Sequence, residues 1–243
     1  MAKAFDRINH FTLFLQLMKK SVPVNIVIML ASWYTNSTGI VNWNGALSPS
    51  YHVSAGVRQG EVISPVIFAN YVDGIISAIQ LKGLGCHIGL KCMGIFMYAD
   101  DLILVSGSVS DLQYMIDSCI EELHNLDLLI NAKKSSCLRI GKSYKSFCTP
   151  LTINGTAIPW TDQITYLGVA IDSSVKFSLN FKSNRCKFHR SFNALYGRIP
   201  KANEYLIVSL VRSFCIPVVM HSLDSVNLNA TSLNILDRLI VNV

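Results

Sequence analysis

The sequence predicts an α+β fold that is followed by an all-helical region from about residue 173. Three observations predict it. Over the first 172 residues, apolar positions at helical spacing alternate with short apolar runs bounded by turn residues. Hydrophobic residues make up 51% of the 243 residues, which is enough to bury a sizeable core. From about Val175 onward the spacing is helical and basic residues are frequent. We therefore expect two parts, residues 1–172 and residues 173–243.

The first expected elements are two helices and a hairpin. Phe, Leu and Met recur at helical spacing over residues 10–20, and Pro23 marks the start of a second helix that ends near Tyr34. Between residues 38 and 55 two strands are expected, with Asn44-Gly45 as their tight turn.

A glycine-rich loop and a third helix come next. The loop Gly56-Val-Arg-Gln-Gly60 leads to Ser64-Pro65, which is typical of a helix cap and first turn. The helix is expected to cover residues 65–80. Two short apolar runs, 95–98 and 102–105, then flank Ala99-Asp100-Asp101, so a hairpin with acidic residues at its tip is expected.

The rest of the α+β part contains one helix and three strands. Ser110 is expected to cap a helix whose apolar positions share one face, namely Leu112, Met115, Ile116, Cys119, Ile120 and Leu123. Strands are expected around 137–140, around 151–154 with a turn at Asn154-Gly155, and over 165–171.

Charge and composition narrow the function. The net charge is +6, but residues 61–130 hold nine acids against two Lys or Arg, between two basic flanks. An acidic centre suits divalent metals and basic flanks suit nucleic acid. Seven cysteines without a Cys-x-x-Cys pair indicate reduced thiols. The start of the chain has no pattern of a secretory leader and no apolar run reaches the length of a membrane span, so we expect an intracellular protein, nuclear or cytoplasmic, without a membrane partner.

The strongest chemical signal is Tyr98-Ala-Asp-Asp101. Two adjacent carboxylates between two apolar strands repel each other unless a cation lies between them. Taken alone, an Asp-Asp pair is more often a solvated turn. Two-metal nucleotidyl transfer, by contrast, needs carboxylates that hold ions about 4 Å apart. Asp100 and Asp101 are therefore the candidate metal ligands.

Five segments in order give the pair its context, because they resemble the active-site blocks of reverse transcriptases of non-LTR, LINE-like retrotransposons. They are Lys3-Ala-Phe-Asp-Arg-Ile-Asn-His10, Gly56-Val-Arg-Gln-Gly-Glu-Val-Ile-Ser-Pro65, Tyr98-Ala-Asp-Asp101, Asn131-Ala-Lys-Lys-Ser135 and Tyr166-Leu-Gly168. The resemblance implies a polymerase palm, an antiparallel sheet backed by helices, over residues 1–172. It implies a helical thumb over 173–243, with the fingers largely missing. The implied activity is RNA-directed DNA synthesis with Mg2+ or Mn2+, an RNA template, a DNA primer and deoxynucleoside triphosphates.

The resemblance also assigns roles to single residues. Phe5 takes the position of the bulky side chain that blocks a ribose 2′-hydroxyl, although as a lone Phe it is core. Arg58 can meet phosphate, while Gln59 and Gly60 can approach a template base pair, the alternative being a loop without a ligand. Tyr98 belongs to the substrate-binding set.

Two later blocks complete the set. Lys134 is the candidate for assisting pyrophosphate departure, with Lys133 beside it as an alternative. Tyr166, Leu167 and Gly168 match the primer grip. Between Lys176 and Arg212 eight basic residues accompany a single acid, with Phe177, Phe181, Phe188, Phe192 and Tyr196 interleaved, so this helical region is expected to follow a duplex backbone. The aromatic residues are more often the buried stripe of such a helix.

One metal ligand of the family lies outside the sequence. The first block usually reads Asp-x-x-Lys-Ala-Phe-Asp, and Lys3 places that first aspartate immediately before Met1. If this segment is extended, Asp6 lies roughly 20 Å from that position and cannot replace it. We therefore expect no appreciable polymerase activity from these 243 residues alone. Two explanations fit this register. One, which we favour, is an internal methionine chosen as the start of a gene model, and the other is a decayed copy of the element that is translated from there.

Two alternatives to an active polymerase of this kind stay open. One is a non-catalytic nucleic-acid-binding remnant of such an element. The other is a related palm polymerase, such as an intron maturase or a viral RNA-copying enzyme. The viral class usually has Gly-Asp-Asp where this chain has Ala99-Asp100-Asp101, and Phe5 favours deoxynucleotides. The oligomeric state does not follow from the sequence.

Overall fold

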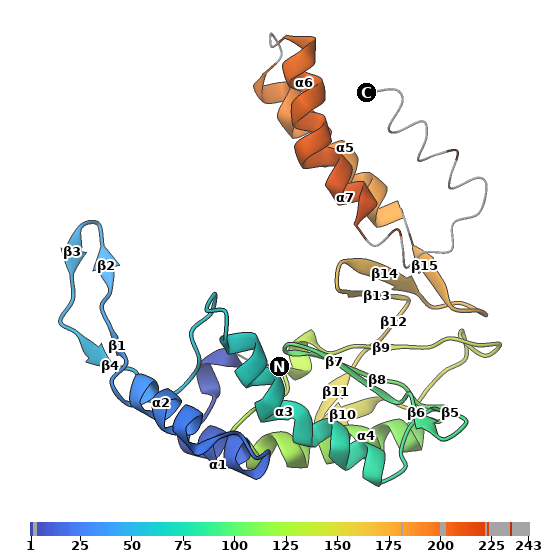
Figure 1. Cartoon of the computed structure of the whole chain (residues 1–243). Helices are drawn as coiled ribbons and strands as arrows, with labels where there is room; N and C mark the ends of the chain where they lie inside the picture. The colour runs from blue at the N-terminus through green and yellow to red at the C-terminus, as the bar shows by residue number, and fades with distance from the viewer. Residues whose placement is uncertain (2–3, 181, 200–202, 222, 224–233, 235–243) are drawn as a thin grey trace. The chain divides into compact units, whose positions relative to one another are not determined.

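The computed structural model describes residues 1, 4–180, 182–199, 203–221, 223 and 234 of the chain (Figure 1). It divides into two compact units, each of two segments: Met1–Ser135 with Cys148–Pro159, and Ser136–Phe147 with Trp160–Val243. The domain boundary expected between residues 172 and 173 lies inside the second unit. The compact units do not test this boundary, because it was predicted between functional domains, and it stays a prediction. Lys3, which fixes the register of the first block, and Phe181, an aromatic residue of the expected basic helical region, lie outside the described residues.

The first unit contains the four helices that the sequence predicted and a short 3-10 turn before them. They are η1 (Phe5–Arg7), α1 (His10–Lys19), α2 (Val24–Thr35), α3 (Ser64–Leu81) and α4 (Val109–Asn125). The Asn9 side chain caps α1 by accepting a hydrogen bond from the Thr12 amide at 3.2 Å. The distance of roughly 20 Å between Asp6 and the position before Met1 assumed an extended backbone. Because Phe5–Arg7 forms the η1 turn instead, that distance is an overestimate.

The strands of the first unit form hairpins. The two ends of one long ribbon are β1 (Thr38–Gly39) and β4 (Tyr51–His52), and its tip is β2 (Asn42–Trp43) with β3 (Ala46–Leu47). This ribbon extends away from α2 (Figure 1). The other hairpins are β5 (His87–Ile88) with β6 (Lys91–Cys92), β7 (Ile95–Tyr98) with β8 (Asp101–Leu104), and β10 (Leu151–Ile153) with β11 (Thr156–Ile158).

Two predicted turns are confirmed by their backbone angles. Asn44-Gly45 and Asn154-Gly155 each have positive φ at both residues, as a two-residue hairpin turn of type I′ requires. Asparagine and glycine tolerate this left-handed conformation better than other residues, which is why the sequence signal was reliable here.

Helix α3 is the centre of the first core. It packs against α1 and α4 and contacts β7. Its buried face carries Ile67, Phe68, Tyr71, Val72, Ile75 and Ile79. The facing residues of α4 include Met115, Cys119 and Leu123, as predicted from their spacing. The Tyr71 hydroxyl remains satisfied inside this core because it donates to the Leu126 carbonyl at 2.8 Å.

Two predicted helix caps are wrong. Ser108, not Ser110, caps α4, since its Oγ accepts from the Asp111 amide at 3.1 Å. The two serines lie two residues apart, and only the extended backbone at Ser108 allows the capping geometry. Ser64 does not cap α3 either: it is the first helical residue, and its buried Oγ has no partner among the described residues.

The strands of the second unit differ from prediction in two places. The apolar run 165–171 is a hairpin, β13 (Gln163–Tyr166) and β14 (Val169–Asp172), instead of one strand. A third strand, β15 (Ser178–Asn180), pairs with β14 inside the region expected to be helical. In addition β9 (Cys137–Leu138) pairs in parallel with β12 (Trp160–Thr161), a contact that sequence periodicity does not reveal.

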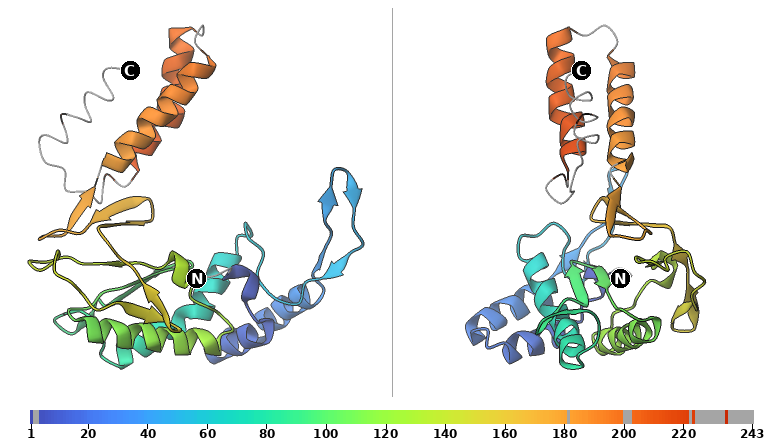
Figure 2. Two further views of the ribbon diagram at one scale, coloured as in Figure 1. Left: turned by 180° about the vertical axis from the view of Figure 1, so that it is seen from behind. Right: turned by 90° about the vertical axis from the view of Figure 1, so that its right-hand side faces the viewer.

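The helices of the second unit form an antiparallel pair of segments. They are α5 (Lys182–Arg198) and a continuous run of α6 (Glu204–Leu210), the π-helical turn η3 (Val211–Cys215) and α7 (Ile216–Met220). Figure 2 shows the two segments side by side, and α5 contacts both η3 and α7. Pro217 lacks the N–H that would close an α-helical bond to residue 213, and the π turn lies directly before it.

The fold class is therefore α+β, as predicted. Within the described residues the strands form seven separate sheets, of which the largest has three strands. In the part of the chain that the structure describes, no helix combines the length and the apolar character needed to cross a membrane.

Candidate active site

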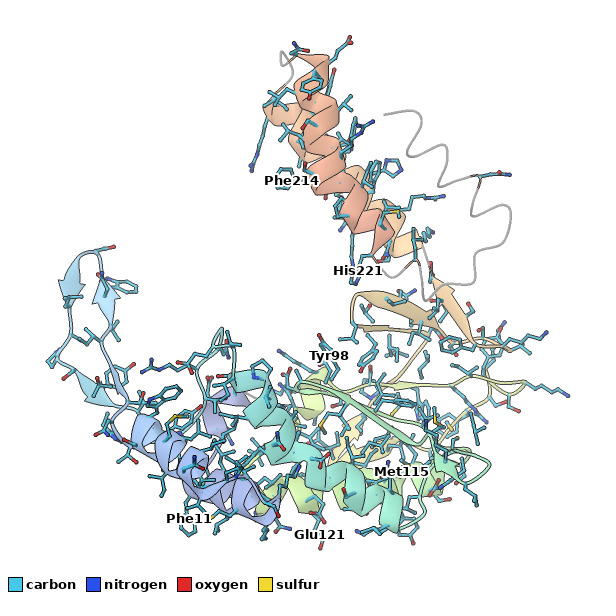
Figure 3. The ribbon with its side chains drawn as sticks, in the orientation of Figure 1. Phe11, Tyr98, Met115, Glu121, Phe214 and His221 are labelled. Atoms are coloured by element: carbon cyan, nitrogen blue, oxygen red, sulfur yellow. The ribbon has the colours of Figure 1, made fainter. Side chains whose placement is uncertain are left out.

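The acidic pair lies at the tip of the β7–β8 hairpin, which confirms the predicted position between two strands. Tyr98 pairs with Asp101, so Ala99 and Asp100 alone form the turn. Asp100 is half-buried and Asp101 is exposed. Tyr98 is labelled beside this tip in Figure 3 and is 62% exposed. Both carboxylates and the tyrosine are thus accessible to a ligand.

The turn is strained at one residue. Ala99 has φ 49°, in the left-handed region that costs a residue with a Cβ about 1 to 2 kcal/mol. Such strain persists only where the surrounding structure enforces it, and it is frequent at functional sites. The four-residue strands on both sides, joined by the register Ile95 to Leu104, enforce it here.

The first residue of the chain lies against this turn. The amino group of Met1 donates a hydrogen bond to the main-chain carbonyl of Asp100 at 2.8 Å. The backbone of the first sequence block therefore reaches the acidic tip, although the two are about a hundred residues apart in the chain.

The donor set fits a divalent cation in part. Carboxylate oxygens are the ligands that Mg2+ and Mn2+ prefer. Among the described residues neither Asp100 nor Asp101 forms an ion pair, so their charges are not neutralised by a neighbouring base. The described residues contain no group of three His, Cys, Asp or Glu side chains with metal-binding geometry. Among the described residues Asp100 and Asp101 are therefore the candidate carboxylate ligands at this hairpin.

The glycine-rich loop is bonded to the first sequence block. The Gly56 amide donates to the Ile8 carbonyl and the Val57 amide donates to the Phe5 carbonyl, both at 2.8 Å. Gly56 has φ +88°, and a Cβ there would lie 2.9 Å from the Asp6 Cα. Glycine at this position therefore permits both the conformation and the close approach of the two segments.

The side chains of this loop lie differently from one another. The Arg58 guanidinium donates to the Ser37 Oγ at 2.8 Å and lies 3.5 Å from the Glu61 carboxylate. Gln59 and Gly60 are exposed, and no heavy atom of the described residues lies within 4 Å of a Cβ built on Gly60. Arg58 thus has protein partners in this structure, while Gln59 and Gly60 face open space.

Phe5 packs against the core with one face of its ring and is partly exposed. Its ring stacks on Phe68 with centroids 4.6 Å apart and planes inclined by 17°. The side chain is half-buried and packs against the main core. The two predictions for Phe5, a core residue and a side chain that blocks a ribose 2′-hydroxyl, are therefore compatible, because one face of the ring is packed and part of the ring remains accessible.

His10 and Tyr34 support the loop, and the sequence reading gave them no role. The His10 Nε2 lies 2.7 Å from the Gly56 carbonyl oxygen, and the centroids of the His10 and Tyr34 rings are 4.7 Å apart. Burial raises the pKa of Tyr34, the charge of Glu61 raises it further and Arg58 opposes the shift. The buried Tyr34 hydroxyl has no partner among the described residues. No local signal identifies this cluster, since it joins residues of three separate segments.

Lys134 lies in a 3-10 turn, η2 (Ala132–Lys134). Its amide donates to the Asn131 carbonyl at 3.0 Å, and the Ser135 hydroxyl donates to the same oxygen at 3.0 Å. Lys133 and Lys134 are both exposed, so the structure does not separate them.

In the second unit, Leu167 and Gly168 form the turn of the β13–β14 hairpin. Their φ angles are 48° and 84°, again the type I′ pattern. Tyr166 is the last residue of β13 and is half-buried, and it pairs with Val169.

The basic helix α5 presents most of its cations to solvent. Lys182, Lys187, Arg190 and Arg198 are exposed. Phe188 is buried in the core of this unit, and Phe188, Phe192 and Tyr196 follow one another along the helix with centroid distances of 6.3 and 6.0 Å. The aromatic residues of α5 therefore belong mainly to its packed face. The expected helical region also includes 224–233 and 235–243, which lie outside the described residues.

Comparison with known proteins agrees with this arrangement. A model of the family described as reverse transcriptase (RNA-dependent DNA polymerase) matches residues 1–171. The chain is similar to the Retrovirus-related Pol polyprotein from type-2 retrotransposable element R2DM of Drosophila melanogaster, with 26% identity over 188 residues, 74% of this chain and 18% of that protein.

Two further relatives extend the similarity along the chain. The RNA-directed DNA polymerase from mobile element jockey of Drosophila melanogaster is 23% identical over 95% of this chain and 25% of its own length. The Pol polyprotein of the type-1 retrotransposable element R2 from Popillia japonica is 23% identical over 98% of this chain and 34% of its own length. The matched part of the chain thus spans 18% to 34% of the length of these relatives.

Proposed function

Because the chain belongs to the reverse transcriptase (RNA-dependent DNA polymerase) family, as a domain of the non-LTR retrotransposon type, we propose that Asp100 and Asp101 hold the divalent cations for RNA-templated DNA synthesis. The observation that carries the proposal is their position at the end of the β7–β8 hairpin, where Asp100 lies in the two-residue turn and Asp101 is the first residue of β8. There the strained turn presents two carboxylates that form no ion pair with any residue that the structure describes.

The chemistry needs little covalent help from the protein. Bound Mg2+ or Mn2+ would activate the primer 3′-hydroxyl and neutralise the leaving pyrophosphate. Asp100 and Asp101 supply the negative charge that retains cations at the hairpin tip. Lys134, on its exposed turn, is the proposed partner of the pyrophosphate, with Lys133 as the alternative.

The remaining residues of the first unit are proposed to select the nucleotide and the template. Phe5 would exclude a ribose 2′-hydroxyl, and its stacking on Phe68 fixes the orientation of the ring. Gln59 and Gly60 would lie against a template base pair, and Tyr98 beside the incoming nucleotide. Arg58 would exchange its Ser37 and Glu61 contacts for phosphate.

The second unit is proposed to hold the primer strand and the duplex. Tyr166, Leu167 and Gly168 form a tight turn of the kind that can support a primer backbone, and α5 carries an exposed basic surface. In these terms residues 1–172 are the palm and residues 173–243 the thumb. The proposed partners are an RNA template, a DNA primer and deoxynucleoside triphosphates.

The position of Met1 suggests how the metal site can be completed. Its nitrogen lies 2.8 Å from the Asp100 carbonyl, so a residue joined to it would begin at the acidic tip. An aspartate added there would supply the carboxylate that the family pattern requires before Met1. The test therefore compares the 243-residue chain with a version carrying one additional N-terminal aspartate.

Two readouts test the proposal. Mn2+ binding, followed by electron paramagnetic resonance, is expected to strengthen by at least about tenfold with the added aspartate, since a further charged ligand raises affinity. An added asparagine is the control. Single-nucleotide incorporation on an RNA template with a DNA primer is expected only in the aspartate version, and D100N and D101N should each abolish it. Incorporation that survives D100N/D101N would overturn the proposal.

A second candidate function rests on the absence of a three-ligand group among the described residues. In it, the chain binds nucleic acid without catalysis. Tight duplex binding by both versions, with no incorporation by either, would favour this alternative.

A further inference from the structure

The turn Leu167-Gly168 contacts the end of α7 within the second unit. His221 follows the last residue of α7, and its Nε2 lies 3.0 Å from the Leu167 carbonyl oxygen. Figure 3 labels His221 at this end of the helix. Since a carbonyl only accepts, the Nε2 must carry the hydrogen.

The imidazole also lies directly over Gly168. A Cβ built on this glycine would be 2.8 Å from the His221 Nε2 and 3.1 Å from its Cδ2. Any side chain at residue 168 would therefore displace the ring, in addition to the strain of a φ of 84°. The turn and the ring fit each other without space between them.

His221 is held from the opposite side by α5. The Asn184 Nδ2 donates to the His221 carbonyl at 3.1 Å, and Asn184 is only 4% exposed. The His221 amide donates to the Pro217 carbonyl at 2.9 Å and closes the last turn of α7. The side chain of His221 thus bonds the hairpin, while its backbone bonds both helical segments.

We propose that His221 is a positioning residue that fixes the Leu167-Gly168 turn relative to the basic helix α5, so that one rigid surface grips the primer strand. The proposal rests on the function proposed for this turn and helix. His221 acts through Leu167 and Gly168 and does not touch the reacting atoms. Separating the hairpin from the helices is expected to weaken duplex binding and loosen the turn.

The direct test uses the full chain and a fluorescently labelled RNA–DNA duplex, with binding followed by anisotropy. H221A is expected to weaken binding about threefold to tenfold, the effect of one lost hydrogen bond. H221Q is expected to restore most of the affinity because glutamine offers an N–H donor at similar reach. The matched control is H52A, which removes another imidazole within 2.7 Å of a carbonyl oxygen, that of Thr35, far along the chain.

A double-mutant cycle tests the ring and the glycine together. G168A is expected to weaken binding, and adding H221A to it should cause little further loss because the ring is already displaced. G155A is the control for backbone strain, since Gly155 has φ +76° and no described residue comes within 4 Å of the added Cβ. Additive effects of G168A and H221A would overturn the proposal.

Hydrogen exchange separates this inference from the proposed function. H221A is expected to speed amide exchange at residues 167–169 by about tenfold, whether or not the chain binds a duplex. Unchanged exchange there would overturn the positioning role. Failure of the wild-type chain to bind the duplex, with faster exchange in H221A, would instead overturn only the proposed function of this turn.

Discussion

Phe5 stacks on Phe68 with ring centroids 4.6 Å apart, which joins the segment before α1 to the first turns of α3. The same segment is bonded to the Gly56–Val57 backbone, so three stretches of the sequence meet at this ring pair. The wall of the proposed nucleotide site and the packing of the main core therefore depend on the same contact.

The stacked pair should behave as one energetic unit. F5A and F68A should each reduce the free energy of unfolding, F68A by about 3 to 5 kcal/mol because Phe68 is fully buried. In the double variant the losses should fall short of additivity by about 1 kcal/mol, the value of an aromatic pair. Urea denaturation measures all three. F11A is the control, because Phe11 is 72% exposed, and strict additivity would show that the rings are not coupled.

Gly56 and Gly60 offer a matched pair of substitutions in one loop. Both have φ near +90°, but a Cβ at Gly56 lies 2.9 Å from the Asp6 backbone, whereas a Cβ at Gly60 has no neighbour within 4 Å in the part of the chain that the structure describes. G60A should cost about 1 kcal/mol for backbone strain alone. G56A should cost at least about 2 kcal/mol more because the Asp6 segment has to move. Equal losses in thermal unfolding would mean that the contact between loop and first block does not stabilise the protein.

Local patterns predicted the features that depend on local chemistry. The Asn-Gly turns, the α4 apolar face and the acidic hairpin followed from residue types at fixed spacing. The hairpin at Leu167-Gly168 was missed, because leucine gives no signal for the left-handed conformation that it adopts there. The same limit applies to Ala99, whose φ of 49° follows from the strand register and not from the residue itself.

Contacts between segments far apart in the chain could not be predicted from the sequence, for a different reason. The parallel pairing of β9 with β12 joins Cys137 to Trp160, and no periodicity within either strand encodes the partner. The His10 contact with Gly56 and the His221 contact with Leu167 have the same character. For the candidate site, motif order identified the acidic pair and the loop, while the residues that support them needed the structure.

Strain at Ala99 predicts a stabilising substitution. A99G should raise the free energy of unfolding by about 0.5 to 1 kcal/mol, because relief of left-handed strain exceeds the greater backbone entropy of glycine in the unfolded chain. A46G is the control. Because Ala46 lies in strand β3, the A46G variant should lose stability by a similar amount. A destabilising A99G would show that the turn is relaxed with alanine present.

Cys119 predicts a specific loss of stability at alkaline pH. Burial raises the pKa of its thiol from 9.0 to about 12, a shift that Lys82 opposes and Glu122 reinforces. Between these values the folded chain keeps a proton that the unfolded chain loses, so folding is favoured fully below pH 9 and less as the pH rises. The slope is about 1.4 kcal/mol per pH unit in that window.

Urea denaturation at pH 8 and pH 10.5 measures the effect. Between these two pH values the free energy of unfolding of C119A should fall by about 2 kcal/mol less than that of the wild type, because the variant has no thiol at residue 119 to ionise on unfolding. C186A is the control, since Cys186 is exposed on α5 and its removal leaves the core of the first unit unchanged. An identical pH dependence for C119A and wild type would contradict the raised pKa, because groups that both proteins contain, among them the buried Tyr71 with its own raised pKa, contribute equally to the two curves.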